Sequence, residues 1–387
     1  MRADGLAGPS RRGFINAGVG AASLAGSTAA CSGGSGRAGS PRAGRASAGG
    51  ELTEAVLAAF RTHRLVGIGE VHNLQQHHDL LETLVVDPRL PDVVDDIVVE
   101  FGNARYQDTM DRFIAGQVVG DVDLRQAWRN TSQSPVQTWD QPVYEQFFRS
   151  VRAANWGLPA GKRMRVLLGD PPLDWSKITT LSQLEAVLAQ GDTYPASLIE
   201  RQVLAKGRRA LLCYGMAHLL RHPASRSHLP PNLVSIIEQR TGERTYTIAD
   251  LVPLADDPGG LAAKLSRYPR NTVIPAKGTW LGSFNAGLVA QVLIAGKPGQ
   301  LVNPYCGLPL RSVIDDGLYE GQPADLTASC WNPAIYLDPV YWHELQRRNA
   351  LRGDPVKLDS YRQEQPARFP LKKLPPSAEC GHGAPAH

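Results

Sequence analysis

The 387-residue sequence lacks an apolar run long enough to cross a membrane, because the stretch over residues 14–30 is only weakly apolar and rich in Ala and Gly. A membrane-spanning helix needs about 20 strongly apolar residues. Also absent are a phosphate-binding loop, a dinucleotide-binding glycine fingerprint, a GxSxG elbow and an HExxH motif. The sequence therefore carries no signature of the nucleotide-binding, serine-hydrolase or zinc-protease classes that these motifs typify. It contains no internal repeat.

A charge excess of one sign is missing from the part of the chain that we expect to fold. The whole chain has 41 Lys and Arg against 37 Asp and Glu, and residues 1–50 hold six Arg but only one Asp. The remainder is therefore near neutral. The basic isoelectric point belongs mainly to the N-terminal segment, and it predicts no nucleic-acid partner.

Cysteine is scarce, with five residues in the chain. Cys213 falls inside an apolar run, which predicts a small buried side chain. Cys306 and Cys330 flank a loop-rich section, so they are the candidates for a disulfide in an oxidising compartment. Spacing alone does not establish that pairing.

The N-terminal 31 residues have the pattern of a twin-arginine export signal. Ser10-Arg11-Arg12-Gly13-Phe14-Ile15-Asn16 precedes the weakly apolar stretch, which closes at Ala29-Ala30-Cys31. Two alternatives stay open here. Cys31 is either the lipidated first residue of a bacterial lipoprotein, or the two alanines mark an ordinary signal-peptidase site. We expect export to the cell envelope or periplasm, with membrane contact only through a lipid anchor at Cys31.

Composition divides the remaining chain into three parts. Residues 32–50 are almost entirely Gly, Ser, Ala and Arg, which is typical of a flexible linker. Residues 51–374 are predicted to form a single α/β domain, long for one domain but within the observed range. Residues 375–387 are rich in Pro and Gly and are predicted to be a disordered tail.

Strand-like and helix-like patterns alternate along residues 51–250. This alternation predicts an α/β fold with a mostly parallel central sheet, helices on both faces and right-handed crossovers. After Asp250 the pattern loosens, and frequent prolines, glycines and clustered aromatics predict an elaborated C-terminal section of extra strands and loops. The predicted buried strands lie at residues 65–68, 97–99, 165–168, 210–214 and 245–248.

Two similar strings follow two of these predicted strands. They are Gly69-Glu70-Val71-His72 and Gly215-Met216-Ala217-His218. A third predicted strand ends at Glu100. In an open α/β sheet, ligands bind beyond the carboxyl ends of the strands, so these side chains are expected to meet there. Two imidazoles with carboxylates are the groups of an acid–base or metal site, which we predict at Glu70, His72, Glu100 and His218.

Three further residues are candidates for binding a cofactor beside this site. Asp170 follows the predicted strand at residues 165–168, although its Gly-Asp-Pro-Pro context is also that of an ordinary turn. Arg105 and Gln107 begin the helix predicted after Glu100. They either reach back to the cleft or lie exposed on the surface.

His77 and His78 lie in a helix predicted at about residues 74–86. Because they are adjacent, a helix points them in different directions, and at most one can face the cleft. We expect both at the surface.

The motifs resemble those of the Tiki/erythromycin-esterase superfamily, and the closest branch is the ChaN-like haem-binding uptake proteins. The resemblance rests on Gly-Glu-Val-His after the first strand, Val-Val-Glu-Phe-(x)5-Gln-(x)4-Arg-Phe-Ile-Ala-Gly around the second, and a later Gly-x-x-His. It covers roughly residues 60–250. Tiki-type proteins are metal-dependent proteases that use two Gly-x-x-His motifs and a glutamate. Erythromycin esterases open a macrolactone with a histidine base, and ChaN-type proteins are exported lipoproteins that bind haem.

By this resemblance Glu70, His72, Glu100 and His218 are implied active-site residues, and Gln107 is shared with the ChaN-like branch. The leading hypothesis is an exported hydrolase-like protein that acts on an ester, lactone or peptide carbonyl of a small-molecule or peptide substrate. His72 and His218 would act as bases or, with Glu100, as ligands of Mn²⁺, Co²⁺ or Zn²⁺. The alternative is a surface lipoprotein without turnover, in which the same histidines hold haem or a metal.

Overall fold

The central sheet has seven strands in the order β3-β2-β4-β1-β5-β9-β6. All neighbouring strands pair in parallel except β6, which is antiparallel to β9. This confirms the predicted α/β fold with a mostly parallel sheet. The strands are β1 (Leu65–Glu70), β2 (Asp96–Asn103), β3 (Arg165–Asp170), β4 (Ala210–Gly215), β5 (Thr245–Asp250), β6 (Thr272–Pro275) and β9 (Asp316–Tyr319).

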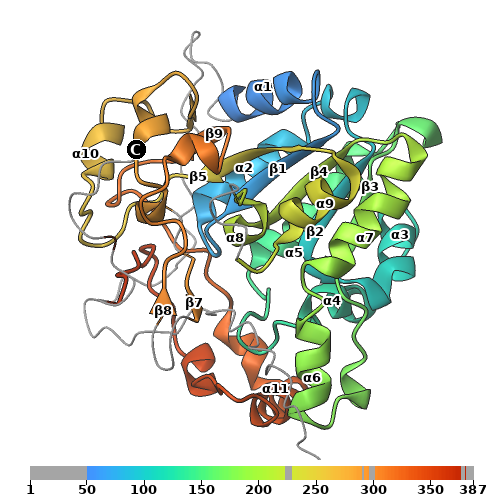
Figure 1. Ribbon diagram of the computed structural model, residues 1–387. Coiled ribbons are helices and arrows are strands. Elements are labelled where there is room, and N and C mark those ends of the chain that lie inside the picture. Colours follow the sequence, from blue (N-terminus) through green and yellow to red (C-terminus); the bar gives the residue numbers. More distant parts are fainter. Residues whose placement is uncertain (1–49, 223–228, 290–291, 296–300, 376–379, 381–387) are drawn as a thin grey trace, which may run out of the picture.

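The computed structural model describes residues 50–222, 229–289, 292–295, 301–375 and 380 (Figure 1). The predicted export signal with Cys31, and all but the last residue of the predicted linker, lie outside the described residues. Within the described ranges, no helix is both long and apolar enough to cross a membrane.

Helices cover both faces of the sheet (Figure 1). One face packs α1–α5 against strand residues that include Val66 and Ile68, and the other packs α7 and α9 against residues that include Leu65 and Val98. Successive residues of a strand thus enter opposite cores, as expected for a parallel sheet buried on both faces. These helices are α1 (Gly50–Ala59), α2 (Gln75–Val85), α3 (Gln107–Ile114), α4 (Asp121–Arg129), α5 (Pro142–Ala154), α7 (Thr193–Gln202) and α9 (Leu233–Thr241). The short helix α8 (Met216–Leu219) directly follows β4.

β2 is longer than the sequence predicts. The apolar pattern ends at Glu100, but β2 continues to Asn103, so Glu100 lies inside the strand. The register with β3 shifts between Val99 and Asn103, and such an irregularity redirects the side chains beside it. Glu100 is therefore buried among neighbouring strand ends rather than exposed in a loop.

The elaborated C-terminal section extends the sheet and builds a separate core beside it. That core packs α10 and β6 against the loops before β9. The last helix, α11, lies beside α6 at one end of the molecule (Figure 1), where Leu351 packs near Leu184. The remaining elements are α6 (Leu181–Leu188), α10 (Leu261–Leu265), α11 (Pro339–Ala350), and the two-stranded sheet of β7 (Ile294–Ala295) and β8 (Leu301–Val302).

The disulfide prediction for Cys306 needs correction. Cys306 is bonded to Cys380, so its predicted pairing with Cys330 is wrong. The bonded residues are 74 positions apart, and spacing in sequence gives no sign of such proximity. Cys380 is buried, although it lies in the segment predicted to be a tail. Cys213 is a buried free cysteine in β4, as predicted.

Candidate functional site

Buried carboxylates line the carboxyl edge of the sheet. Five of the six parallel strands carry a carboxylate at or near their carboxyl end, whereas β4 ends on Gly215. Burying an ionised carboxylate is costly unless it is paired or hydrogen-bonded. A row of such groups therefore requires cationic or hydrogen-bonding partners along the edge. In sheet order the carboxylates are Asp170 of β3, Glu100 of β2, Glu70 of β1, Asp250 of β5 and Glu320, which follows β9.

His72 follows β1 and is held by Glu70. Its Nδ1 is hydrogen-bonded to Oε1 of Glu70, and its ring packs edge-on against Trp139 with centroids 5.0 Å apart. The His72 side chain is 25% exposed, and its Nε2 lies 4.0 Å from Oε1 of Glu100. Burial lowers the pKa of His72, but the Glu70 and Glu100 carboxylates outweigh it and the net pKa is raised.

His218, in α8, has the same two kinds of contact. Its Nδ1 lies 2.6 Å from Oδ1 of Asp192, and its Nε2 lies 3.3 Å from Oε1 of Glu100. Burial lowers the pKa of His218, but Asp192 and Glu100 outweigh it and raise the pKa well above the usual value. Asp192 precedes α7 and also accepts the backbone N–H of Leu233 at 2.9 Å. Sequence reasoning missed Asp192 because it belongs to no predicted strand end.

Glu100 is the common partner of both histidines. Its Oε2 accepts the backbone N–H of Gly215 at 2.6 Å, and its Oε1 accepts Nε2 of Gln133 at 2.5 Å. Burial raises the pKa of Glu100, but His218 and His72 outweigh it and the pKa is lowered. Gln133 comes from a loop, and no pattern in the sequence marks it as a site residue. Both imidazoles thus direct Nε2 toward one ionised carboxylate.

The donor types around Glu100 fit a divalent metal. A histidine that binds a metal usually donates its other ring N–H to a carboxylate or carbonyl, and Glu70 and Asp192 occupy those positions for His72 and His218. These ligand atoms are nevertheless too far apart for one ion. In the described part of the chain, the cluster of possible ligands whose atoms all lie within 4.8 Å of one another consists of other residues, which are described below. The two rings must therefore move closer together for one ion to contact both of them and Glu100.

Asp170 lies at the same sheet edge, next to Glu100 in strand order. It accepts the backbone N–H of Ser132 at 2.9 Å and the Ser132 hydroxyl at 2.5 Å. Burial raises the pKa of Asp170 to about 8, against the opposing effect of these hydrogen bonds. The structure thus places Asp170 in a buried, hydrogen-bonded position on the strand next to that of Glu100.

Gln107 and Arg105 have contacts elsewhere. Nε2 of Gln107 donates to the carbonyl of Val166 at 2.8 Å, and its Oε1 accepts the N–H of Leu168 at 2.8 Å. Gln107 thereby pairs with the outer edge of β3, the edge strand of the sheet that the described residues form. Arg105 is 47% exposed and forms an ion pair with Asp174 at 3.0 Å. The structure brings neither residue to the histidine pair.

His77 and His78 correct a prediction, because each is only 2% exposed. Nδ1 of His77 lies 2.8 Å from Oδ1 of Asp250, and Nε2 of His78 lies 3.4 Å from Oε2 of Glu70. Burial lowers the pKa of His77, but Asp250 outweighs it and raises the pKa. Burial lowers the pKa of His78 to about 4. Both histidines lie where α2 covers the row of carboxylates, and the sequence pattern of α2 does not reveal this.

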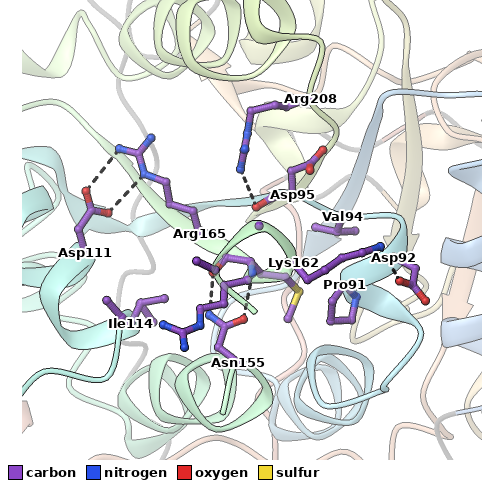
Figure 2. A pocket seen from close by; sticks show the side chains of 15 residues that line it. Pro91, Asp92, Val94, Asp95, Asp111, Ile114, Asn155, Lys162, Arg165 and Arg208 are labelled. Carbon is purple, nitrogen blue, oxygen red and sulfur yellow. Dashed lines mark hydrogen bonds and ion pairs between the residues drawn. The ribbon is translucent and has the colours of Figure 1, made fainter. Parts of the chain in front are cut away.

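A cavity of about 450 Å³ lies at the opposite, amino end of the strands (Figure 2). Its charged side chains neutralise one another: Lys162 lies 2.9 Å from Asp92, and Arg165 lies 3.4 Å from Asp111. β2 and β3 begin beside it, whereas the histidines lie beyond the strands' other ends. This cavity is therefore separate from the candidate site.

Comparisons with known proteins give fold neighbours only. No protein-family model matches the chain, and no curated protein does. A Bacillus cereus protein of known crystal structure has a TM-score of 0.46 and 12% identity, over 72% of this chain and 92% of its own. A succinoglycan biosynthesis protein gives 0.48 and 8%, over 70% and 91%. ChaN of Campylobacter jejuni, with cofacially bound haem, gives 0.33 and 14%, over 51% and 84%.

Proposed function

We propose that the protein is a hydrolase that activates water beside His72, Glu100 and His218 for attack on an ester, lactone or peptide carbonyl. One observation carries the proposal. Nε2 of both His72 and His218 faces the Glu100 carboxylate. Each Nδ1 contacts a carboxylate of its own, which is Glu70 for His72 and Asp192 for His218. A carboxylate on Nδ1 selects the ring tautomer and stabilises the imidazolium that forms when Nε2 takes a proton.

The two histidines differ in a way that suits two roles. His72 is the more exposed ring and lies farther from Glu100, so it is the group positioned to take a proton from water. His218 is 13% exposed and lies against a carboxylate at both nitrogens. When no metal is bound, these carboxylates favour its protonated form, which can stabilise negative charge that develops on the carbonyl oxygen. Glu100 keeps both rings directed toward one point.

A divalent ion, Mn²⁺, Co²⁺ or Zn²⁺, fits the same donors and would be held by His72, Glu100 and His218. When bound, it would polarise the carbonyl and lower the pKa of a water molecule. The two Gly-x-x-His strings support a further proposal, that the chain is a distant member of the Tiki/erythromycin-esterase superfamily.

The proposed hydrolase is tested on the purified full chain, stripped of metal and then supplied separately with each ion. An ester, lactone and peptide panel provides the substrates. We expect His72→Ala and His218→Ala each to lower the rate by about 10²–10⁴-fold. His343→Ala is the matched control, because His343 is exposed. Equal rates in all four proteins contradict the proposal. A Soret band on titration with haemin that is lost in His72→Ala, without any turnover, supports the haem-binding alternative instead.

We further propose that the protein is exported through the twin-arginine signal and works outside the cytoplasm, and that any membrane anchor is a lipid on Cys31. The Cys306–Cys380 disulfide supports this, since disulfides persist mainly in oxidising compartments. Changing Arg11 and Arg12 together to Lys should retain the protein in the cytoplasm, as judged by cell fractionation. Changing Arg42 and Arg45 to Lys is the matched control and should leave export intact. Normal export of the first double variant would refute the signal.

A further inference from the structure

A second cluster of buried polar groups lies behind the histidine pair. It joins His77 from α2, Asp250 from the end of β5 and Glu320 from the residue after β9. One ligand atom from each lies within 4.8 Å of the other two, and none of the three residues is more than 2% exposed. Three elements far apart in sequence thus bring an imidazole and two carboxylates together in the protein interior.

One oxygen in this cluster has no hydrogen-bond partner. Oε1 of Glu320 is buried, and no donor among the described residues reaches it. The neighbouring carboxylate is well supported, since Asp250 accepts the N–H of Val71 at 2.7 Å and meets Nδ1 of His77 at 2.8 Å. A buried acceptor without a donor is costly, so an unpartnered oxygen on one of three clustered ligand residues indicates a missing group.

We propose that His77, Asp250 and Glu320 bind a divalent transition-metal ion, with Zn²⁺ and Mn²⁺ as the probes. The two carboxylates carry the charge that neutralises such an ion inside the protein. One nitrogen and two oxygens are donors that both ions accept. The ion would tie α2 to the ends of β5 and β9. This site is separate from the proposed hydrolytic one and does not depend on it.

The cluster is nevertheless linked to the first site through Glu70. Oε2 of Glu70 lies 4.0 Å from Nε2 of His77, and Oε1 of Glu70 holds Nδ1 of His72. The N–H that Asp250 accepts belongs to Val71, the residue before His72. An ion at the second site would therefore fix both the backbone and the carboxylate that position His72.

The rival interpretation needs no ion. In it Glu320 is a neutral acid that shares a hydrogen with Asp250, a contact between the two carboxyl groups that the structure also contains. Glu320→Gln distinguishes the two. Gln has nearly the same shape and supplies a donor for Asp250, so it substitutes well for a neutral acid. It removes the charge that a metal ligand needs.

The experiment measures metal content and melting temperature on the full chain. The chain is refolded with chelator and then with or without Zn²⁺ or Mn²⁺, since a buried ion exchanges slowly. We expect the wild type to melt at least about 5 °C higher with metal. Glu320→Gln should bind one ion fewer than the wild type and show a smaller shift. Glu238→Gln, at an exposed helix position, is the matched control and should behave as the wild type.

The His72→Ala/His218→Ala double variant separates the two sites. If the second site exists, this variant keeps one ion and a metal-dependent shift in melting temperature. The proposal is overturned if Glu320→Gln keeps the wild-type metal content and shift, or if the double variant binds no ion. Should Glu320→Gln fail to fold, the double variant alone decides. If the wild type shows no hydrolysis but binds an ion at His77, Asp250 and Glu320, the proposed function is wrong and this proposal still holds.

Discussion

Gly215 leaves open the space that the His72 ring occupies. A Cβ atom at Gly215 would lie 2.8 Å from Cε1 and 2.9 Å from Nε2 of His72, and 3.2 Å from Oε2 of Glu100. Real Cβ atoms do not approach other atoms as closely as the first two distances. β4 thus ends on a glycine, whereas the neighbouring strands β1 and β2 carry the carboxylates Glu70 and Glu100. The glycine allows His72, which follows β1, to lie over the end of β4.

Gly215→Ala is therefore a direct probe of the position of His72. The φ angle of Gly215 is −53°, which alanine adopts without strain, so the added methyl group acts mainly by displacing the ring. We expect kcat/KM for the proposed hydrolysis to fall by about 10²-fold, because a shift of about 1 Å in a catalytic group has that effect. Gly161→Ala, where nothing lies within 4 Å, is the control. Unchanged activity in Gly215→Ala would argue that His72 has no catalytic role.

Glu100→Gln removes the charge that both histidines face and keeps the side-chain shape. The amide oxygen can still accept the N–H of Gly215, so we expect the melting temperature to change by only a few degrees. Activity or metal occupancy should fall by about 10²-fold or more, since the shared charge is lost. Glu238→Gln serves as the exposed control. If Glu100 only supports the backbone, Glu100→Gln will be as active as that control.

Gln107→Ala tests whether this residue is structural. It should expose the N–H of Leu168 and the carbonyl of Val166 on the outer edge of β3. We expect the free energy of unfolding to fall by about 1–3 kcal/mol, measured by urea denaturation. Catalysis and metal or haem binding should be unchanged in the folded fraction. Gln117→Ala, at an exposed position, provides the baseline, and loss of cofactor binding without loss of stability would restore the binding hypothesis.

The strands of the N-terminal half could be predicted from sequence because each is buried on both faces. The run at residues 210–214 becomes β4 (Ala210–Gly215), and that at 245–248 becomes β5 (Thr245–Asp250). Continuous apolar runs are the signal of such strands. β9 gives no comparable signal, because its four residues begin with Asp316 and contain one glycine. Its place beside β5 depends on contacts distant in sequence.

The candidate site was predictable where a residue lies at or near a strand end. His72, Glu100 and His218 meet because their strands are neighbours in the sheet. Asp192 and Gln133 come from connecting segments, where no periodic pattern marks the residues that face inward. The burial of His77 and His78 was unpredictable for another reason: polar side chains in a helix indicate a solvent face unless their buried partners are known.

His78 should make the protein sensitive to acid. Burial lowers its pKa to about 4 from the ordinary value of 6.5, so between those pH values the unfolded chain binds a proton that the native protein does not. Falling pH therefore favours unfolding across this window, and the cost is complete below pH 4. His78→Phe keeps the edge-on ring contact with Tyr144, at 4.7 Å between centroids, and cannot be protonated.

The measurement is the difference in unfolding free energy between wild type and His78→Phe as a function of pH. The difference should shift in favour of the variant as pH falls from 6.5 to 4, by about 3 kcal/mol at most. The neighbouring groups Glu70 and His77 titrate in both proteins, so their direct contributions largely cancel in the difference. The pH slope is the readout, because Phe differs in size from His and shifts stability at every pH. His343→Phe, at an exposed position, should show no such slope. Parallel curves for wild type and His78→Phe would mean that His78 titrates normally and that the contact of its Nε2 with Glu70 offsets its burial.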